Sequence, residues 1–310
     1  MWDYDGFIGK AKLYFTRAEE HPRADDDEMA LWLLLGLEFL LRAPLAKISP
    51  TLLADPQSGE SIMHAAGYPL KSDGNQPKSI QAKTVIIRLG AIIPAFIKER
   101  QEDANFLIGL RNEELHSSDS SLAVDIAKWL PHFTRVIEVI STHLGLDPAD
   151  LVGDSLMELG RELVDKEDKR LEHEVQKRIE AAKAFFSHLK PEEIEARQAA
   201  RPRHNLVVGG KSEPVVSYPD WPINCPACGE NKIPLKLRPI RATNERLEDD
   251  EICRDVICIA TGLSCPICDL ELTSTAEIRA AKIQQQYVRQ EWESLQDRYI
   301  DSLEPDYGND

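Results

Sequence analysis

The sequence predicts a mainly α-helical protein that ends in a small β domain built around a metal ion. Three observations lead to this prediction. Apolar residues follow helical spacing through most of the first 200 of the 310 residues. Four of the six cysteines form two Cys-x-x-Cys pairs in the last third of the chain, and short β-like runs lie between the pairs. The length fits about two domains of roughly 100–200 residues each.

The first 150 residues are expected to begin with two helices of an antiparallel four-helix bundle. Apolar residues recur at helical spacing over residues 5–20. The acidic residues 25–28 then favour the start of a helix through its macrodipole. The run Ala30–Leu41 is apolar on nearly every face, which is typical of a central core helix.

The other two bundle helices are expected over residues 80–100 and 121–144. Proline is unfavourable inside a helix, so Pro94 and Pro131 should kink or split them. Residues 43–79 carry five prolines and are predicted to form a long loop, with one short helix at Thr51–Ala54, before the third helix.

A connector is expected after the bundle. Leucines and other apolar residues from Leu156 to Leu189 recur mostly three, four or seven positions apart amid alternating charge, which indicates a long helix or a short coiled coil. The pattern is imperfect around residues 166–170. An Arg-Pro-Arg-His linker at 201–204 and the pair Gly209-Gly210 mark the end of this connector.

The two cysteine pairs predict a structural zinc site. Each Cys-x-x-Cys turn can place two thiolates on one tetrahedral ion, and two turns close a four-thiolate site with no open position. The 36 residues between the pairs can form the strands of a zinc ribbon. A thioredoxin-like redox pair is the alternative, but it needs one such motif that opens a helix. Iron could replace zinc at such a site. The predicted zinc ligands are Cys225, Cys228, Cys265 and Cys268.

Two further cysteines lie between the pairs. Cys253 and Cys258 are five positions apart on a predicted strand, so they face opposite sides, and small buried core residues are the favoured interpretation. After the ribbon, Ser274 and Glu277 form a capping box that predicts a final helix to about Leu303. The expected organisation is a helical bundle at 1–150, a connector at 151–205, a zinc ribbon at 206–273, and a terminal helix and tail at 274–310.

A second candidate site is the run RNEELH, which contains Arg111, Asn112 and His116. An Arg followed by a His at this spacing is weak evidence by itself, because it also occurs at Arg197 and His204 in the linker region. The context of the first match is more informative. It follows a long apolar helix in an all-helical region, and a polar residue comes directly after the arginine.

With these residues, the N-terminal 150 positions resemble the HEPN superfamily, helical bundles that carry an Arg-polar-x-x-x-His type of motif. The apolar helix over residues 30–41 is similar to the core helix of that family. The resemblance implies a metal-independent endoribonuclease that acts as paired domains, and therefore a homodimer. It also implies a toxin or phage-defence effector, with an antitoxin or defence-system protein as a possible partner and RNA, such as tRNA or another structured RNA, as substrate.

The residue types suit that chemistry. RNA can supply its own 2′-OH as nucleophile, so the protein needs a proton-transfer group and a fixed cation. We expect His116 to be the general acid/base, Arg111 to stabilise phosphate charge, and Asn112 to orient the phosphate or Arg111. Positions five apart on a straight helix diverge by about 140°, so Arg111 and His116 of one chain would converge only if the helix breaks. A symmetric dimer avoids this difficulty.

Two other interpretations stay open. Arg111 could pair with Glu102 or Glu114 on the surface, and His116 could be an ordinary helix-end residue. The chain would then be a non-catalytic dimeric adaptor that binds protein or nucleic acid, or a zinc-ribbon regulator of transcription. The formal charge of −16 disfavours proteins that coat nucleic acid without specificity.

The sequence also predicts a cytoplasmic protein. Residues 1–5 lack the basic and apolar regions of a signal peptide. The longest apolar run, Met29–Leu41, has 13 residues and is short for a bilayer span. Free cysteines in metal-type pairs fit a reducing compartment.

Overall fold

The computed structural model describes residues 2–21, 27–69, 76–118, 120–200, 221–248, 251–295 and 298. The linker at 201–204, the Gly209-Gly210 pair and the tail after 298 lie outside the described residues. The chain divides into two compact units, residues 1–167 and 168–310, and the boundary falls inside one long helix.

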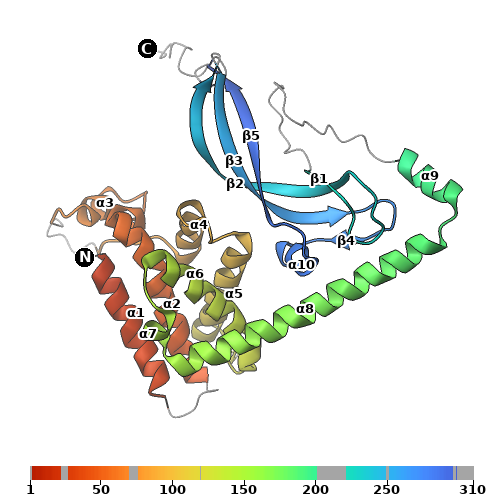
Figure 1. Ribbon diagram of the computed structural model, residues 1–310. Helices are drawn as coiled ribbons and strands as arrows, with labels where there is room; N and C mark the ends of the chain where they lie inside the picture. Colours follow the sequence, from red (N-terminus) through yellow and green to blue (C-terminus); the bar gives the residue numbers. More distant parts are fainter. Residues whose placement is uncertain are drawn as a thin grey trace. The chain divides into compact units, whose positions relative to one another are not determined.

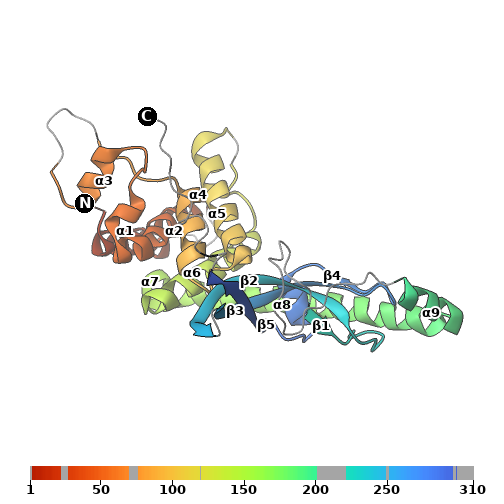
Figure 2. The same cartoon turned by 90° about the horizontal axis from the view of Figure 1, so that it is seen from above.

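The first unit is helical. Its longer helices pack around a common apolar core, and α1 and α2 lie side by side along much of their lengths (Figures 1 and 2). The elements are α1 (Tyr4–Glu19), α2 (Asp27–Ile48), the 3-10 turn η1 (Pro50–Leu53), α3 (Gly59–Ala65), α4 (Ala82–Ile92), α5 (Lys98–His116), the 3-10 turn η2 (Ile126–Lys128), α6 (Leu130–Leu144) and α7 (Pro148–Val152).

Helix α2 is the central element of this core. Leu33, Leu34, Leu37 and Leu40 on it are completely buried. It continues through the buried Pro44 to Ile48, so the predicted loop begins six residues later than expected, and it is interrupted by η1 and by the helix α3, which was not predicted. At 22 residues α2 is also long and apolar enough to cross a bilayer by length and composition, and 67% of its apolar window is buried inside the protein.

Prolines set the boundaries of the next helices. Pro94 lies between α4 and α5, so the expected helix over 80–100 is split into two. Pro131 stands at the beginning of α6, which therefore starts at Leu130, and only the short turn η2 forms in the preceding residues. The RNEELH run forms the last turns of α5 and ends with that helix.

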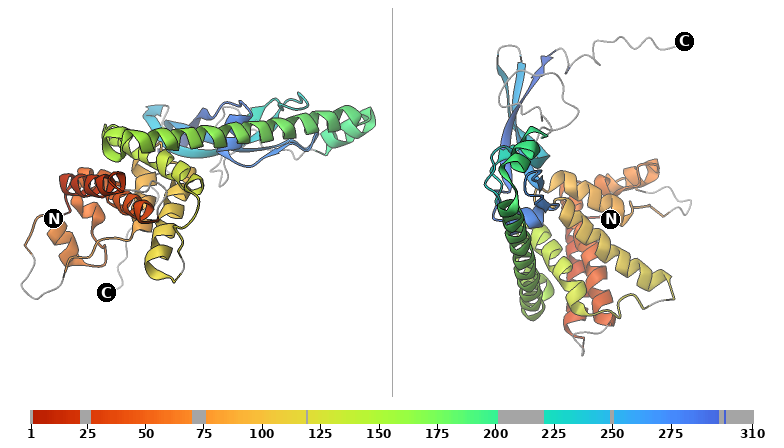
Figure 3. Two further views of the ribbon diagram at one scale, coloured as in Figure 1. Left: turned by 90° about the horizontal axis from the view of Figure 1, so that it is seen from below. Right: turned by 90° about the vertical axis from the view of Figure 1, so that its right-hand side faces the viewer.

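The connector is one uninterrupted helix, α8 (Asp154–His188), followed by α9 (Pro191–Ala199) (Figure 3). Leu156, Met157, Leu159 and Leu163 of α8 belong to the core of the first unit. Its later apolar residues belong to the core of the second unit, and they are Leu171, Val175, Ile179, Ala182 and Phe186. The irregular spacing at 166–170 thus coincides with the boundary between two cores.

The second unit contains an antiparallel sheet of five strands (Figure 1). The strands are β1 (Trp221–Ile223), β2 (Ile233–Glu248), β3 (Glu251–Ser264), β4 (Glu271–Leu272) and β5 (Gln286–Ser294). Strand β3 is central. It pairs with β2 along one edge, and with β4 and β5 along different lengths of the other edge. The cysteine pairs lie in turns beside β1–β2 and β3–β4.

The predicted terminal helix is wrong over residues 281–294, and its part after residue 298 lies outside the described residues. Half of the capping box is present: Ser274 accepts the Glu277 N–H at 3.2 Å, but the Glu277 carboxylate accepts the Thr273 N–H instead. The helix α10 spans only Thr275–Ala280. Lys282 then adopts a left-handed conformation with φ of 59° and stops the helix. The following residues form β5, because the edge of β3 over Glu251–Ile259 offers them a hydrogen-bonding partner.

The packing of α1 against α2 gives a stability prediction. A methyl group at Gly36 would lie 2.5 Å from the Phe15 ring, which is itself fully buried. Gly36→Ala should therefore lower the free energy of unfolding by about 1–3 kcal/mol, measured by urea denaturation. Gly9→Ala is the matched control, because nothing lies within 4 Å of that added methyl. Equal stability of the two variants would contradict this packing.

Candidate functional site

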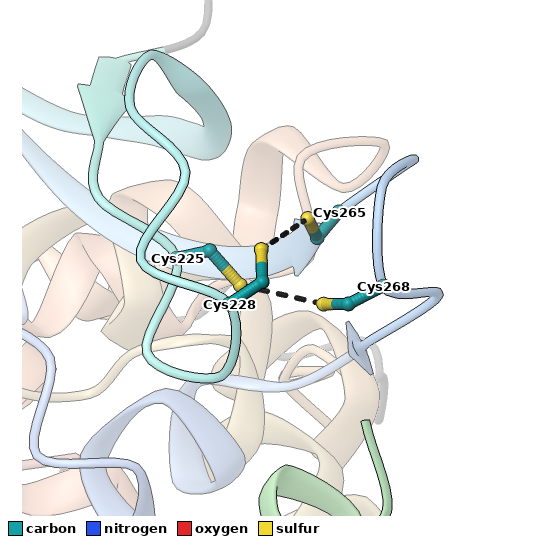
Figure 4. Close-up of side chains that lie close together, drawn as sticks. All are labelled: Cys225, Cys228, Cys265 and Cys268. Atoms are coloured by element: carbon teal, nitrogen blue, oxygen red, sulfur yellow. Dashed lines mark hydrogen bonds between the residues drawn. The ribbon is translucent and has the colours of Figure 1, made fainter. Parts of the chain in front are cut away.

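Four cysteines from two separate turns converge in the second unit (Figure 4). The sulfur atoms of Cys225 and Cys268 are 3.6 Å apart, and those of Cys228 and Cys265 are 3.7 Å apart. All four lie within 4.8 Å of one another. Three of these residues are buried and Cys228 is half-buried. The structure thus brings together all four residues that the sequence predicts as metal ligands.

The spacing of the sulfurs fits a bound metal ion. A tetrahedral ion with metal–sulfur bonds of about 2.3 Å would separate its ligand atoms by about 3.8 Å. The two observed distances of 3.6 and 3.7 Å are close to that value. Four soft sulfur ligands favour zinc or iron over magnesium or calcium, and they leave no coordination position open.

The two turns have the same backbone geometry, which explains how they present paired thiols. In the first turn the Gly229 N–H donates to the Cys225 carbonyl at 3.0 Å. In the second, the Asp269 N–H donates to the Cys265 carbonyl at 2.9 Å. Gly229 and Asp269 are both left-handed, with φ of 75° and 58°. Glycine takes this conformation without strain, so only the first turn has a visible sequence signal.

Cys225, Cys228 and Cys268 differ in the pKa of their thiols. Hydrogen bonds from the Cys265 and Cys268 thiols lower the pKa of Cys225 to about 2. Burial raises the pKa of Cys228 to about 12. The pKa of Cys268 is raised because its proton is held in the hydrogen bond with Cys225. A metal must displace the remaining protons, so its affinity should fall as the pH is lowered.

The other two cysteines are core residues, as the sequence predicts. Cys253 and Cys258 are completely buried in β3, and neither belongs to the four-sulfur cluster. The Cys258 thiol donates to the Val256 carbonyl at 3.7 Å, and burial raises the pKa of that thiol. Cys258 is therefore held as a neutral thiol and is unsuited to metal binding.

The cysteine cluster gives a second prediction. Cys265→Ser should remove most bound metal, measured by elemental analysis of the purified protein, and should destabilise the second unit, because a structural metal contributes directly to folding. Cys258→Ala is the matched control, since it removes a buried thiol from the same sheet and should retain one metal ion per chain. Loss of metal from both variants, or from neither, would contradict the assignment of the ligands.

Arg111 lies at a buried charge cluster in the first unit. Its guanidinium forms an ion pair with Oε2 of Glu38 on α2. The other carboxylate oxygen of Glu38 is 2.9 Å from Nη1 of Arg42. The exposed fractions of these three side chains are only 13%, 19% and 11% for Arg111, Glu38 and Arg42. Two arginines thus share one carboxylate, and the expected surface pair of Arg111 with Glu102 or Glu114 does not form.

The other two motif residues are placed differently. Asn112 and His116 are exposed, and no residue in the described part of the chain forms a hydrogen bond or ion pair with the His116 ring. Helix α5 continues without a break from Arg111 to His116. The two side chains therefore leave the helix about 140° apart. One chain does not bring the predicted catalytic residues together.

The sequence analysis missed Glu38 and Arg42. The available signal was a carboxylate and a guanidinium, four positions apart, in a helix that is otherwise apolar. His132 was not predicted from the sequence either. In the structure His132 Nδ1 lies 2.5 Å from Oδ1 of the buried Asp103, which ties α6 to α5. No sequence spacing could show this pair, because 29 positions separate its members.

A strip of aromatic rings and cations lies beside the charge cluster on α1 and α2. The Tyr14 ring stacks on Phe39 and on Trp32, with 5.5 Å between centroids in both pairs. Lys10 lies 4.4 Å from the Phe39 centroid, and Arg17 lies 5.1 Å from the Trp32 centroid. A pocket of about 460 Å³ opens at one end of this aromatic strip, and its lining includes Lys10, Phe39, Glu38 and Arg42.

Comparisons with known proteins add no family assignment: no family model, curated protein or solved structure matches this chain. The structure contains a helical N-terminal unit, which the HEPN resemblance predicts. It also contains a four-cysteine cluster that could bind a metal, which the zinc-ribbon prediction requires. The sites therefore rest on the geometry and chemistry of this chain.

The buried charge cluster gives a third prediction. Glu38→Gln leaves two guanidiniums close together without their shared carboxylate, so it should lower the free energy of unfolding by about 3 kcal/mol in urea denaturation. Glu102→Gln is the control, because its ion pair with Lys98 is largely exposed and contributes little. A small effect of Glu38→Gln would show that the cluster does not stabilise the bundle.

Proposed function

We propose that this protein is a HEPN-type endoribonuclease that acts as a homodimer, with a structural zinc ribbon in its second unit. In this proposal Arg111, Asn112 and His116 form the catalytic set. The proposal extends to a toxin or phage-defence effector that works in the cytoplasm, a role that follows from the HEPN resemblance alone.

The observation that carries the proposal is the arrangement of the motif on α5. Arg111 is directed to the Glu38 carboxylate, whereas His116 is exposed at the helix end, about 140° away. Each chain therefore presents two half-sites. A two-fold dimer can join the Arg111 side of one chain to the His116 side of the other and so complete two composite sites.

The charge cluster supports a role for Arg111 beside a phosphate. Arg111 and Arg42 carry two positive charges and Glu38 one negative charge, so the trio keeps a net charge of +1. At the neighbouring pocket Lys10 adds a cation and Asp3 a carboxylate, so the net charge stays at +1. Within an acidic chain, this is a local positive site of the kind that attracts a phosphodiester. The Glu38 carboxylate also fixes the orientation of the Arg111 fork.

The aromatic strip next to this cluster supports RNA as the substrate. Single-stranded nucleic acid is held by aromatic rings that stack on bases and by cations that contact phosphates. Tyr14, Trp32 and Phe39 supply half-buried rings, and Lys10 and Arg17 supply the cations. The strip and the Arg111 cluster meet at the pocket that Glu38 and Phe39 both line.

The proposed reaction uses the RNA's own 2′-OH. The oxygen of this hydroxyl attacks the adjacent phosphorus while the bond from phosphorus to the 5′-oxygen breaks. His116 takes the 2′-OH proton and, once protonated, gives it to the leaving 5′-oxygen, while Arg111 stabilises the charge on the phosphorane. The products carry a 2′,3′-cyclic phosphate and a 5′-OH.

The proposed zinc has a structural function. A site closed by four thiolates has no position for a substrate or water, which is typical of structural zinc. We assign one zinc per chain to Cys225, Cys228, Cys265 and Cys268.

A dimeric adaptor without catalytic activity is the second candidate. The commitment of Arg111 to Glu38 favours it, because an arginine in a buried ion-pair cluster can serve stability alone. The aromatic strip would then bind a protein partner, since aromatic and arginine side chains are also frequent at protein interfaces.

The nuclease is tested with purified wild type and His116→Ala, using total cellular RNA, a chelator and analysis of fragment 3′ ends. We expect the wild type to produce 2′,3′-cyclic phosphate ends and His116→Ala to lose at least about 100-fold in rate, because general acid–base catalysis contributes about that factor or more. His143→Ala is the matched control, since His143 is also an exposed helix-end histidine. Equal cleavage by wild type and His116→Ala would contradict the catalytic role of His116. A cellular function that His116→Ala retains and Cys265→Ser loses would favour the adaptor.

A mixture of two inactive variants tests whether each active site contains residues from both chains. Arg111→Ala and His116→Ala proteins are each inactive in the proposal, but a mixed dimer contains one intact site formed by the wild-type His116 of the first and the wild-type Arg111 of the second. Unfolding and refolding the two variants together should restore cleavage. No restoration from mixed dimers of verified composition would contradict the exchange of residues between chains.

A further inference from the structure

Two consecutive residues of α9 contact both cysteine turns. Arg197 on this short helix reaches the turn of Cys265 and Cys268, and its neighbour Gln198 reaches the turn of Cys225 and Cys228. The sequence analysis had singled out Arg197 only as half of a second Arg…His match. Its partner in that match, His204, lies outside the described residues, and the structure gives Arg197 a different set of contacts.

The Arg197 contacts are to the backbone that positions the sulfurs. Nη1 of Arg197 donates to the carbonyls of Pro266 and Ile267 at 3.3 and 3.2 Å, and these are the two residues between the cysteines. The same nitrogen lies 2.9 and 3.0 Å from the carboxylate oxygens of Asp269. Asp269 is the left-handed residue that closes this turn. One guanidinium thus contacts three of the four residues that follow Cys265 in this turn.

The first turn is held in a similar way. Nε2 of Gln198 donates to a carboxylate oxygen of Glu230 at 2.9 Å. Glu230 follows the left-handed Gly229, and its carbonyl accepts the Cys225 N–H at 2.8 Å. Adjacent side chains of α9 therefore connect the two halves of the four-sulfur cluster, which are otherwise 36 residues apart in the chain.

Packing and charge strengthen this contact. The Arg197 guanidinium lies 5.0 Å from the Phe185 ring centroid, and its side chain is 33% exposed. Ile194, one turn earlier on α9, packs on the apolar core of the second unit. Four thiolates around a divalent ion carry a net charge of −2, and the positive charge of Arg197 lies beside the turn that supplies two of them.

We propose that α9 is part of the metal centre, with Arg197 as a positioning residue that holds the Cys265–Cys268 turn in its ligating geometry. Arg197 does not touch the metal. It acts through the carbonyls and carboxylate of the turn, as outer-shell groups do at other metal sites. Metal binding and the docking of α9 are then one coupled event, and loss of the metal releases the helix from the turns.

The test uses full-length, zinc-loaded protein and a colorimetric zinc chelator. Arg197→Ala should release zinc at least about tenfold faster than the wild type, because outer-shell substitutions typically cost 10–100-fold in affinity. Arg197→Lys keeps the charge but loses the planar fork, so its rate should fall between the two. Glu195→Ala is the matched control, since Glu195 is an exposed residue of the same helix, and it should release zinc at the wild-type rate.

Hydrogen–deuterium exchange of the wild type is a second test, and it requires no substitution. Removal of zinc should raise exchange in α9 while exchange in α1 stays unchanged. The proposal is overturned if Arg197→Ala releases zinc at the wild-type rate, or if exchange in α9 is the same with and without zinc. These measurements do not depend on RNA cleavage, so the proposal can fail or stand separately from the nuclease.

Discussion

The second unit depends on the convergence of four sulfur atoms. Its sheet has only five strands, two of them no longer than three residues, and such a sheet has a limited core of its own. One cysteine turn lies between β1 and β2 and the other between β3 and β4. The distances between their sulfur atoms fit a tetrahedral ion. Because the unfolded chain has no such site, the free energy of binding a metal there would add to the free energy of folding. We infer that the strands, α10 and α9 are ordered together with the metal.

The first unit is subject to a different constraint, a carboxylate in its most apolar helix. The negative charge of the Glu38 carboxylate must be compensated, and the guanidiniums of Arg42 on α2 and Arg111 on α5 provide the positive charge. This arrangement fixes the rotation of α5 relative to α2, because Arg111 has to face the carboxylate. The same rotation leaves His116 at the exposed end of α5, about 140° away. A structural requirement of the bundle therefore separates the two residues that the proposed reaction needs, and a second chain is the simplest way to reunite them.

Helix α8 shows how one element serves two cores. Its early apolar residues, such as Met157, are buried with the bundle, whereas later ones, such as Val175, are buried with the sheet. A coiled coil needs one continuous stripe of apolar residues along the helix. In α8 this stripe is interrupted at 166–170, and the apolar residues before and after the interruption pack in different cores. The break before α9 has a local cause, because Pro191 fits only the first turn of a new helix. That break redirects the chain so that Arg197 can reach the cysteine turns.

The sequence by itself determined the helical class of the first unit, the split at Pro94, the start of a helix at Pro131, the N-cap at Ser274 and the four clustered cysteines. These features are local, since each depends on spacing, proline chemistry or a short motif. Only the tertiary structure decided that Arg111 pairs with Glu38, that Asp103 contacts His132, and that Arg197 contacts the turn of Cys265 and Cys268. It also decided that residues 286–294 form a strand, because these residues pair with the open edge of β3 and bury Tyr287 in the core of the second unit. Contacts between residues distant in sequence are set by packing, and packing leaves no periodic signal in a single chain.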